Sequence, residues 1–178
     1  MGIGRMRNVR RVLERISVVS LALLGTTLCS QTSFACERAG PVSPAAMVRE
    51  ADAIVRTLAL GYATPPTGLN SPDSRLRFRV LEVIRGKEVP PELELPGYPV
   101  DRDDFNEGPV PYAVVRRTGH GGSCYSNFYR PGAEFLLVLK KRDAGYTVEW
   151  YPLGPVNEQL HSPDDPWLAW VRQEAQRK

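Results

Sequence analysis

The clearest pattern of hydrophobic and polar residues lies between positions 75 and 86. Apolar side chains at 76, 78 and 80 alternate with arginines at 75, 77 and 79, which is the period of a β-strand with one apolar and one charged face. The apolar positions then shift by one residue, to Leu81 and Val83. A β-bulge produces such a shift, so the pattern predicts a bent strand. We interpret the arginines as a solvated outer face rather than as a phosphate-binding stripe.

Other segments also show strand patterns, and together they predict a mainly β fold. They are residues 53–60, 92–95, 112–115, 135–139 and 146–151. Residues 135–139 are all apolar, which is typical of a buried strand, and a charged turn at 140–145 leads into the alternating strand at 146–151. A bent strand is how a small closed barrel shares one strand between its two sheets, so we expect such a barrel.

A short helix is predicted on each side of this β region. Ser43 is a suitable N-cap with Pro44 at the first helical position, and the helix is expected to reach Glu50. Near the C-terminus, Ser162 or Asp164 can cap a second helix. The apolar face of that helix carries Trp167, Trp170 and Val171, which we interpret as core residues rather than as a sugar-stacking platform.

The first 35 residues have the pattern of a cleaved signal peptide. Five arginines come first, an uncharged and mostly apolar run follows from position 16 to 29, and Ser33 and Ala35 are the small residues that signal peptidase recognises. Cleavage after Ala35 would leave residues 36–178 as one domain in a secreted or cell-envelope protein, with no stable membrane insertion afterwards. An uncleaved anchor and lipidation of Cys36 stay open as alternatives.

The predicted leader also accounts for most of the basic charge. The whole chain has 23 basic and 20 acidic residues. Residues 1–35 contain five of the basic and one of the acidic residues, which leaves 18 and 19 in residues 36–178. A near-neutral chain is a poor match for nucleic acid, which is bound by a clustered basic surface, so we expect no nucleic-acid partner.

Removal of the leader leaves two of the three cysteines, Cys36 and Cys124. Disulfides persist in exported proteins, so we predict a bond between these two cysteines. In the chain-entropy treatment such a bond contributes at most about 4 to 5 kcal/mol. A metal site with two thiolates would also need His120 or His161 at ligand spacing, and the chain has no Cys-x-x-Cys or His-x-x-x-His pair. We therefore expect neither a metal nor a cofactor.

Two further segments contain residues of the types that hydrolases and calcium-binding loops use. The His-Gly-Gly sequence at 120–122 resembles the oxyanion loop of some esterases, but the chain has no Gly-x-Ser-x-Gly elbow. A hydrolase would need Cys124 as a thiolate beside His120, and the disulfide is the simpler interpretation.

Residues 101–107 are acidic, yet they lack the sixth-position glycine and distal glutamate of an EF-hand calcium site, so an exposed acidic loop is expected.

Several segments, taken in their order, resemble a netrin-like domain of the compact bacterial relatives of tissue inhibitors of metalloproteinases. The matching segments are Cys36, residues 50–56, residues 78–86, and Ser123-Cys124 ahead of residues 132–137. The resemblance implies a five-stranded barrel of the oligonucleotide/oligosaccharide-binding (OB) type, flanked by a short N-terminal helix and a C-terminal helix.

The resemblance also implies a binding site at the new N-terminus. There the α-amine and carbonyl of Cys36 would chelate the catalytic zinc of a protease, Glu37 would enter its specificity pocket, and Arg38 would follow in the cleft. The first functional hypothesis is therefore a non-enzymatic inhibitor-like protein whose partner is a zinc metalloproteinase. The second is an envelope adaptor or ligand-binding module that uses the barrel face or the acidic loop.

Overall fold

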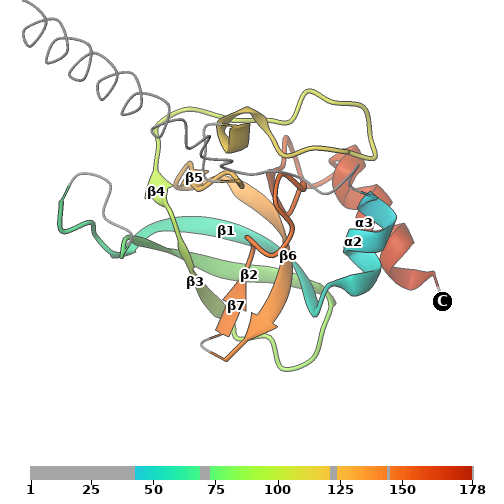
Figure 1. Cartoon of the computed structure of the whole chain (residues 1–178), viewed down its shortest axis with the longest axis horizontal. Coiled ribbons are helices and arrows are strands. Elements are labelled where there is room, and N and C mark those ends of the chain that lie inside the picture. Colours follow the sequence, from blue (N-terminus) through green and yellow to red (C-terminus); the bar gives the residue numbers. More distant parts are fainter. Residues whose placement is uncertain (1–42, 69–72, 121–123, 144, 178) are drawn as a thin grey trace, which may run out of the picture. The chain divides into compact units, whose positions relative to one another are not determined.

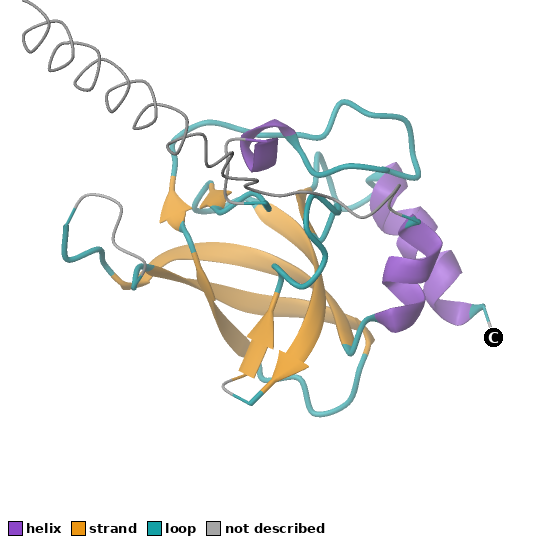
Figure 2. Cartoon of the chain, in the orientation of Figure 1, coloured by secondary structure: helices purple, strands orange, loops and turns teal. Residues whose placement is uncertain are grey.

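The structure is a computed structural model that describes residues 43–68, 73–120, 124–143 and 145–177. All of these residues belong to one compact unit. The described part is mainly β, with two short α-helices and one 3-10 helix (Figures 1 and 2). The predicted leader lies outside the described residues. Among the described residues, no helix combines the length and apolarity that a membrane crossing requires.

The elements follow one another as α2 (Pro44–Glu50), β1 (Ala53–Thr64), β2 (Arg75–Arg85), β3 (Glu92–Pro96), β4 (Tyr98–Pro99), η1 (Arg117–His120), β5 (Phe128–Tyr129), β6 (Glu134–Arg142), β7 (Gly145–Thr147), β8 (Asn157–Gln159) and α3 (Pro166–Gln176). The main sheet is antiparallel, in the order β3-β2-β1-β6-β7, and β8 also pairs with β6. A separate parallel pair joins β4 to β5.

Within the described residues this sheet is not closed into a barrel. Its outer strands β3 and β7 are not hydrogen-bonded to each other. The strand expected at 146–151 ends at Thr147 and pairs with β6 over only three positions, Lys140 to Arg142. So short a strand has few backbone groups left to build a second ladder on its other edge.

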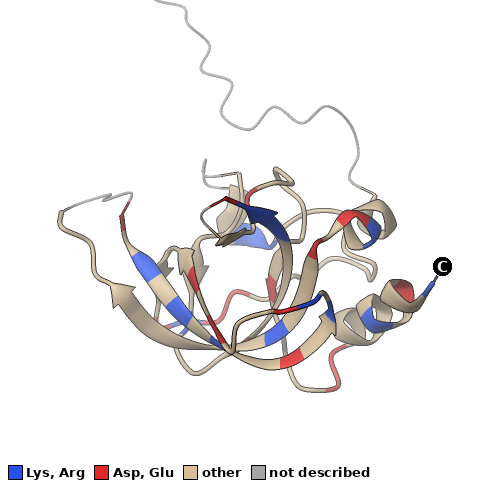
Figure 3. Ribbon diagram, turned by 90° about the horizontal axis from the view of Figure 1, so that it is seen from below, with Lys and Arg blue, Asp and Glu red and all other residues tan. Residues whose placement is uncertain are grey.

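The bulge predicted in β2 is confirmed, but the burial expected with it is wrong. Thr57 pairs with Val80 and Arg56 pairs with Glu82, so the ladder to β1 skips Leu81. Leu81 and Val83 are nevertheless 40% and 47% exposed, because burial continues at the even-numbered positions. The three arginines expected on the outer face are exposed, and Figure 3 shows basic residues along the strands in blue.

Aromatic and aliphatic residues from several strands form the core. The rings of Phe78 and Tyr129 meet edge to face at 4.8 Å, and Phe135 closes the cluster 5.2 Å from Tyr129. Such pairs contribute roughly 0.5 to 1.5 kcal/mol beyond the area they bury. The core extends to Trp167 on α3, which is fully buried and stacks on Trp170. The interpretation of this helix face as core is therefore confirmed.

Both predicted helices are present, and α2 packs against α3 (Figure 1). The Ser43 hydroxyl caps α2 by accepting from the Ala46 N–H, with Pro44 at the first position, as expected. The cap of α3 is Asp165, not Ser162 or Asp164. Its carboxylate accepts from the Trp167 N–H at 2.8 Å, while Ser162 accepts from the Asp164 N–H one turn earlier.

The strand predicted at 112–115 is wrong. Tyr112 and Val115 are buried while the two residues between them are exposed, which is not the alternation of a strand, and the segment is a loop. The strand β8 (Asn157–Gln159) is not predicted from the sequence, because its three residues are polar although they are buried. The loop at 112–115 and strand β8 are neighbours, because the N–H of Arg116, which follows the loop, donates to the Glu158 side chain on β8. Together they contribute to a polar region of the molecule.

Candidate functional site

The structure leaves the predicted N-terminal site untested. Cys36, Glu37 and Arg38 lie outside the described residues. Cys124 is disulfide-bonded, and its partner also lies outside the described residues, so the Cys36–Cys124 pairing stays a prediction. Cys124 has a positive φ of 67°, and its carbonyl oxygen accepts from the N–H of Leu153 at 2.6 Å. This backbone bond attaches the cysteine to the segment that leads into β8.

His120 ends the 3-10 helix η1, four residues before Cys124. Its Nε2 atom lies 2.8 Å from the carbonyl oxygen of Val115. A sulfur in a disulfide is not a thiolate nucleophile, so the geometry gives no support to a Cys124–His120 hydrolase pair.

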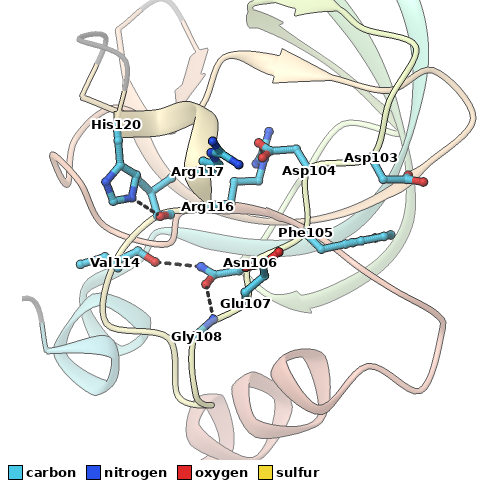
Figure 4. Close-up of a pocket in the computed structure, with 11 residues that line it drawn as sticks. Asp103, Asp104, Phe105, Asn106, Glu107, Gly108, Val114, Arg116, Arg117 and His120 are labelled. Carbon is cyan, nitrogen blue, oxygen red and sulfur yellow. Dashed lines mark hydrogen bonds and ion pairs between the residues drawn. The ribbon is translucent and has the colours of Figure 1, made fainter.

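A cavity of about 580 Å³ opens beside η1, and we call it the loop pocket (Figure 4). One wall is the loop 103–108, and the other is formed by residues 114–117 and His120. The two walls are joined at Asn106, whose amide donates to the Val114 carbonyl at 2.8 Å. The Asn106 side-chain oxygen in turn accepts from the Gly108 N–H at 3.0 Å, which fixes the turn of the loop.

Arg116 forms the floor of the loop pocket and is only 1% exposed. Its Nε donates to the Asp104 carboxylate at 2.8 Å, and its terminal nitrogens donate to the backbone carbonyls of Asn157 and Phe128. The guanidinium carbon also lies 5.4 Å from the centre of the Tyr129 ring, within cation–π range. The buried charge is thus paired and hydrogen-bonded, as burial requires.

Asp104 and Glu158 are the two carboxylates of this network. Asp104 also accepts from the Thr118 hydroxyl. Glu158 is completely buried on β8 and accepts from the Arg116 backbone N–H at 3.2 Å and from the Asn106 amide at 3.0 Å. Burial raises the pKa of Glu158 to about 7, although the Arg116 charge and the two hydrogen bonds oppose the shift.

The rim of the loop pocket carries charges of both signs. Glu107, Arg117 and His120 are exposed, and among the described residues the Glu107 carboxylate and the Arg117 guanidinium have no hydrogen-bond or ion-pair partner. Phe105 turns to the opposite side of the loop, where its ring stacks on His161 at 4.1 Å. The loop is therefore anchored on one side and leaves a polar opening on the other.

The acidic loop was expected to be exposed, and this is only partly right. Asp103 is exposed and pairs with Arg130 at 2.7 Å, which holds the pKa of Asp103 below its usual value. Asp104 and Asn106 instead turn inward, to Arg116 and Glu158. A single sequence gives little signal of this, because Arg116 is one of two adjacent arginines and nothing in the pattern distinguishes the buried one from exposed Arg117.

Within the part of the chain that the structure describes, no group of His, Cys, Asp and Glu side chains is arranged to hold a metal ion. Comparisons with protein-family models, curated proteins and solved structures find no match for the chain.

Proposed function

We propose that the chain is an exported, non-enzymatic binding protein whose recognition surface lies around the loop pocket and the disulfide at Cys124. The observation that carries the proposal is the construction of this region. A buried hydrogen-bond and ion-pair network joins two loop walls beside a preformed cavity, and unpaired charges are left at its rim. Pre-formed cavities with a few convergent polar groups are typical of binding sites.

The strand order supports the finer proposal of an OB-type fold. β1 pairs with both β2 and β6, while β3 and β7 are the two ends of the five-strand path. An OB-type barrel has five strands and is often only partly closed; β3 and β7 already contact each other, and hydrogen bonds between them would complete the barrel here. The bulge at Leu81 bends β2 in the way that such a barrel requires. These features support the likeness to a netrin-like domain.

In the inhibitor-like form of the proposal, the new N-terminus carries the activity. A disulfide to Cys124 would hold Cys36 near the loop pocket, because Cys124 follows His120 on its rim by four positions, which allows their Cα atoms to be at most roughly 14 Å apart. The Cys36 amine and carbonyl would then be presented rigidly to a protease zinc, followed by Glu37 and Arg38. Rigid presentation increases affinity because little conformational entropy is lost on binding.

Inhibition of zinc metalloproteinases by two forms of the protein tests the hypothesis that the Cys36 N-terminus chelates the protease zinc. One form begins at Cys36, and the matched control carries one additional alanine before it. The added residue removes the free α-amine and occupies its place, so we expect inhibition by the first form and at least a hundredfold weaker inhibition by the second. Equal inhibition by both forms, or none by either, would reject the zinc-chelating wedge.

The second candidate function is a ligand-binding module without protease inhibition, and the loop pocket favours it. A rim that combines the Glu107 carboxylate with the Arg117 guanidinium suits polar ligands with groups of both signs, such as peptides. Glu107→Gln and Arg117→Gln should each weaken binding of such a peptide, measured by amide chemical shifts in the loop walls. Arg102→Gln, an exposed position outside the pocket, is the matched control and should bind normally.

A further inference from the structure

A second hollow, which we call the basic hollow, lies where the ends of four strands meet. It has a volume of about 580 Å³ and is lined by Asp52 before β1, Arg85 at the end of β2, Gly86 and Lys87 in the following turn, Lys141 on β6 and Tyr146 on β7. None of these residues lines the loop pocket. The basic hollow therefore needs an explanation of its own.

The charge of the basic hollow is strongly one-sided. Three basic side chains line it, and Asp52 is the one carboxylate among its lining residues. Asp52 is already engaged, because its oxygens accept from the Lys141 backbone N–H at 2.8 Å and from the Lys140 ammonium at 3.4 Å. The bond from Lys141 is the main reason that the pKa of Asp52 is lowered. The carboxylate thus stays ionised and bound to the β6 end.

The basic groups themselves are held but not neutralised. The Arg85 guanidinium donates to the Val48 carbonyl at the end of α2, at 3.1 Å, which fixes its direction and uses one of its five donors. Among the described residues, the ammonium groups of Lys87 and Lys141 have no hydrogen-bond or ion-pair partner. These cations remain available to a ligand.

The backbone between Arg85 and Lys87 is constrained to bring them together. Gly86 has a φ of +112°, and a Cβ at this position would lie 2.9 Å from the Ala53 Cβ. Only glycine can pack this tightly against β1, so the turn places the two cations at a defined position beside the Lys141 strand. The arrangement is part of the fold.

From these observations we propose that the basic hollow binds a phosphate group. The three basic side chains and one carboxylate that line the hollow leave a net charge of two positive, which matches the one to two negative charges of phosphate. An arginine fork beside two lysines is suited to the phosphate oxygens. Sulfate shares this geometry, but a carboxylate has only one charge. The phosphate can come from a soluble phosphate ester or from an anionic lipid headgroup. The proposal is independent of the binding function assigned to the loop pocket.

Titration with inorganic phosphate at constant ionic strength, balanced with chloride, tests the proposal. We expect saturable amide shifts at Gly86, Lys87 and Tyr146 in the wild-type protein. The double variant Lys87→Gln, Lys141→Gln should bind at least tenfold more weakly. Arg79→Gln removes the same type of charge from exposed β2 without touching the hollow, and it should titrate like wild type.

Sedimentation with vesicles distinguishes the two sources of phosphate. Retention on phosphatidylglycerol vesicles but not on phosphatidylcholine vesicles, lost in the double variant, would assign the hollow to a lipid headgroup. A response to inorganic phosphate without vesicle binding would assign it to a soluble ester. If neither probe binds, or if the double variant binds both as wild type does, the proposal is wrong. An unchanged Tm of the double variant shows that its fold is intact.

Discussion

At the scale of single residues, Glu158 gives the protein a specific pH dependence. Its pKa rises from 4.5 to about 7 on folding because the carboxyl is buried. The folded state therefore holds a proton that the unfolded chain has released. The stabilising contribution is complete below about pH 4.5 and is lost as the pH rises through 7, and the whole change amounts to roughly 3 kcal/mol.

Chemical denaturation of wild type and Glu158→Gln between pH 5 and 8 measures this contribution by difference. The glutamine does not titrate, so the free-energy difference between the two proteins should move by about 2 to 3 kcal/mol in favour of wild type at the acid end. Exposed groups such as Asp103 affect both proteins equally and cancel. Parallel stability curves for the two proteins would show that Glu158 titrates at its ordinary pKa.

Arg116 should be among the residues least tolerant of substitution. In Arg116→Met the similar volume is kept, but the Asp104 carboxylate and the carbonyls of Asn157 and Phe128 lose their donor. Breaking a buried ion pair from one side costs about 3 to 5 kcal/mol, so we expect a loss of this size in urea unfolding.

The matched control for Arg116→Met is Arg79→Met, an exposed arginine on β2. Exposed substitutions of this kind change stability by less than about 0.5 kcal/mol. Similar effects of the two substitutions would mean that the guanidinium of Arg116 is not buried in solution.

Sequence patterns predicted the exposed arginine face of β2 because period-two alternation determines which side of a strand meets solvent. They did not predict that Asp104 turns inward and Asp103 outward. That difference depends on Arg116 and Glu158, which are 12 and 54 positions away from Asp104 in the chain and reach it only through the fold. Polar networks of this kind leave no local pattern.

At the scale of elements, the two helix caps should differ in strength. Asp165 is buried and accepts from the backbone N–H groups of Trp167 and His161 and from the His161 ring, whereas Ser43 accepts one bond at an exposed helix start. Loss of a cap costs about 0.5 to 2 kcal/mol. Thermal unfolding should therefore place Asp165→Ala near the upper end of this range and Ser43→Ala near or below its middle.

Asp165→Asn separates the contribution of the capping hydrogen bond from that of the negative charge, because the amide oxygen of asparagine can still accept from the Trp167 N–H. This variant should recover at least half of the stability lost in Asp165→Ala. If Asp165→Ala were no worse than Ser43→Ala, the additional contacts with His161 would contribute nothing to the helix.

Strongly patterned elements were predictable from the sequence, and short or polar ones were not. β1, β2 and β3 are predictable because apolar residues alternate along them, and β6 because residues 135–139 form a continuous apolar run. β8 was missed because the structure buries Asn157 and Glu158 by pairing them, not by hydrophobicity. The loop at 112–115 resembled a strand because its four residues are apolar in sequence, but Tyr112 packs against Trp167 outside any sheet, and Ala113 and Val114 are exposed.

At the scale of the whole molecule, an antiparallel sheet carries a polar, loop-built region at one side and a basic hollow where strand ends meet. Sequence patterning predicted the class of fold and both helices, but barrel closure depends on β7, which the structure ends at Thr147. The proposed inhibitor-like function depends on residues before Ser43, which lie outside the described residues, so it needs a chemical test rather than a geometric one.

The central claim is that export exposes Cys36 and a disulfide to Cys124 fixes the new N-terminus. Intact mass of the exported protein, before and after reduction, followed by non-reducing peptide mapping, tests this claim most directly. We predict a chain that begins at Cys36 with no lipid, gains two hydrogens on reduction, and yields one linked peptide pair containing Cys36 and Cys124. Two free thiols, a different first residue, or a Cys124 bonded elsewhere would contradict it.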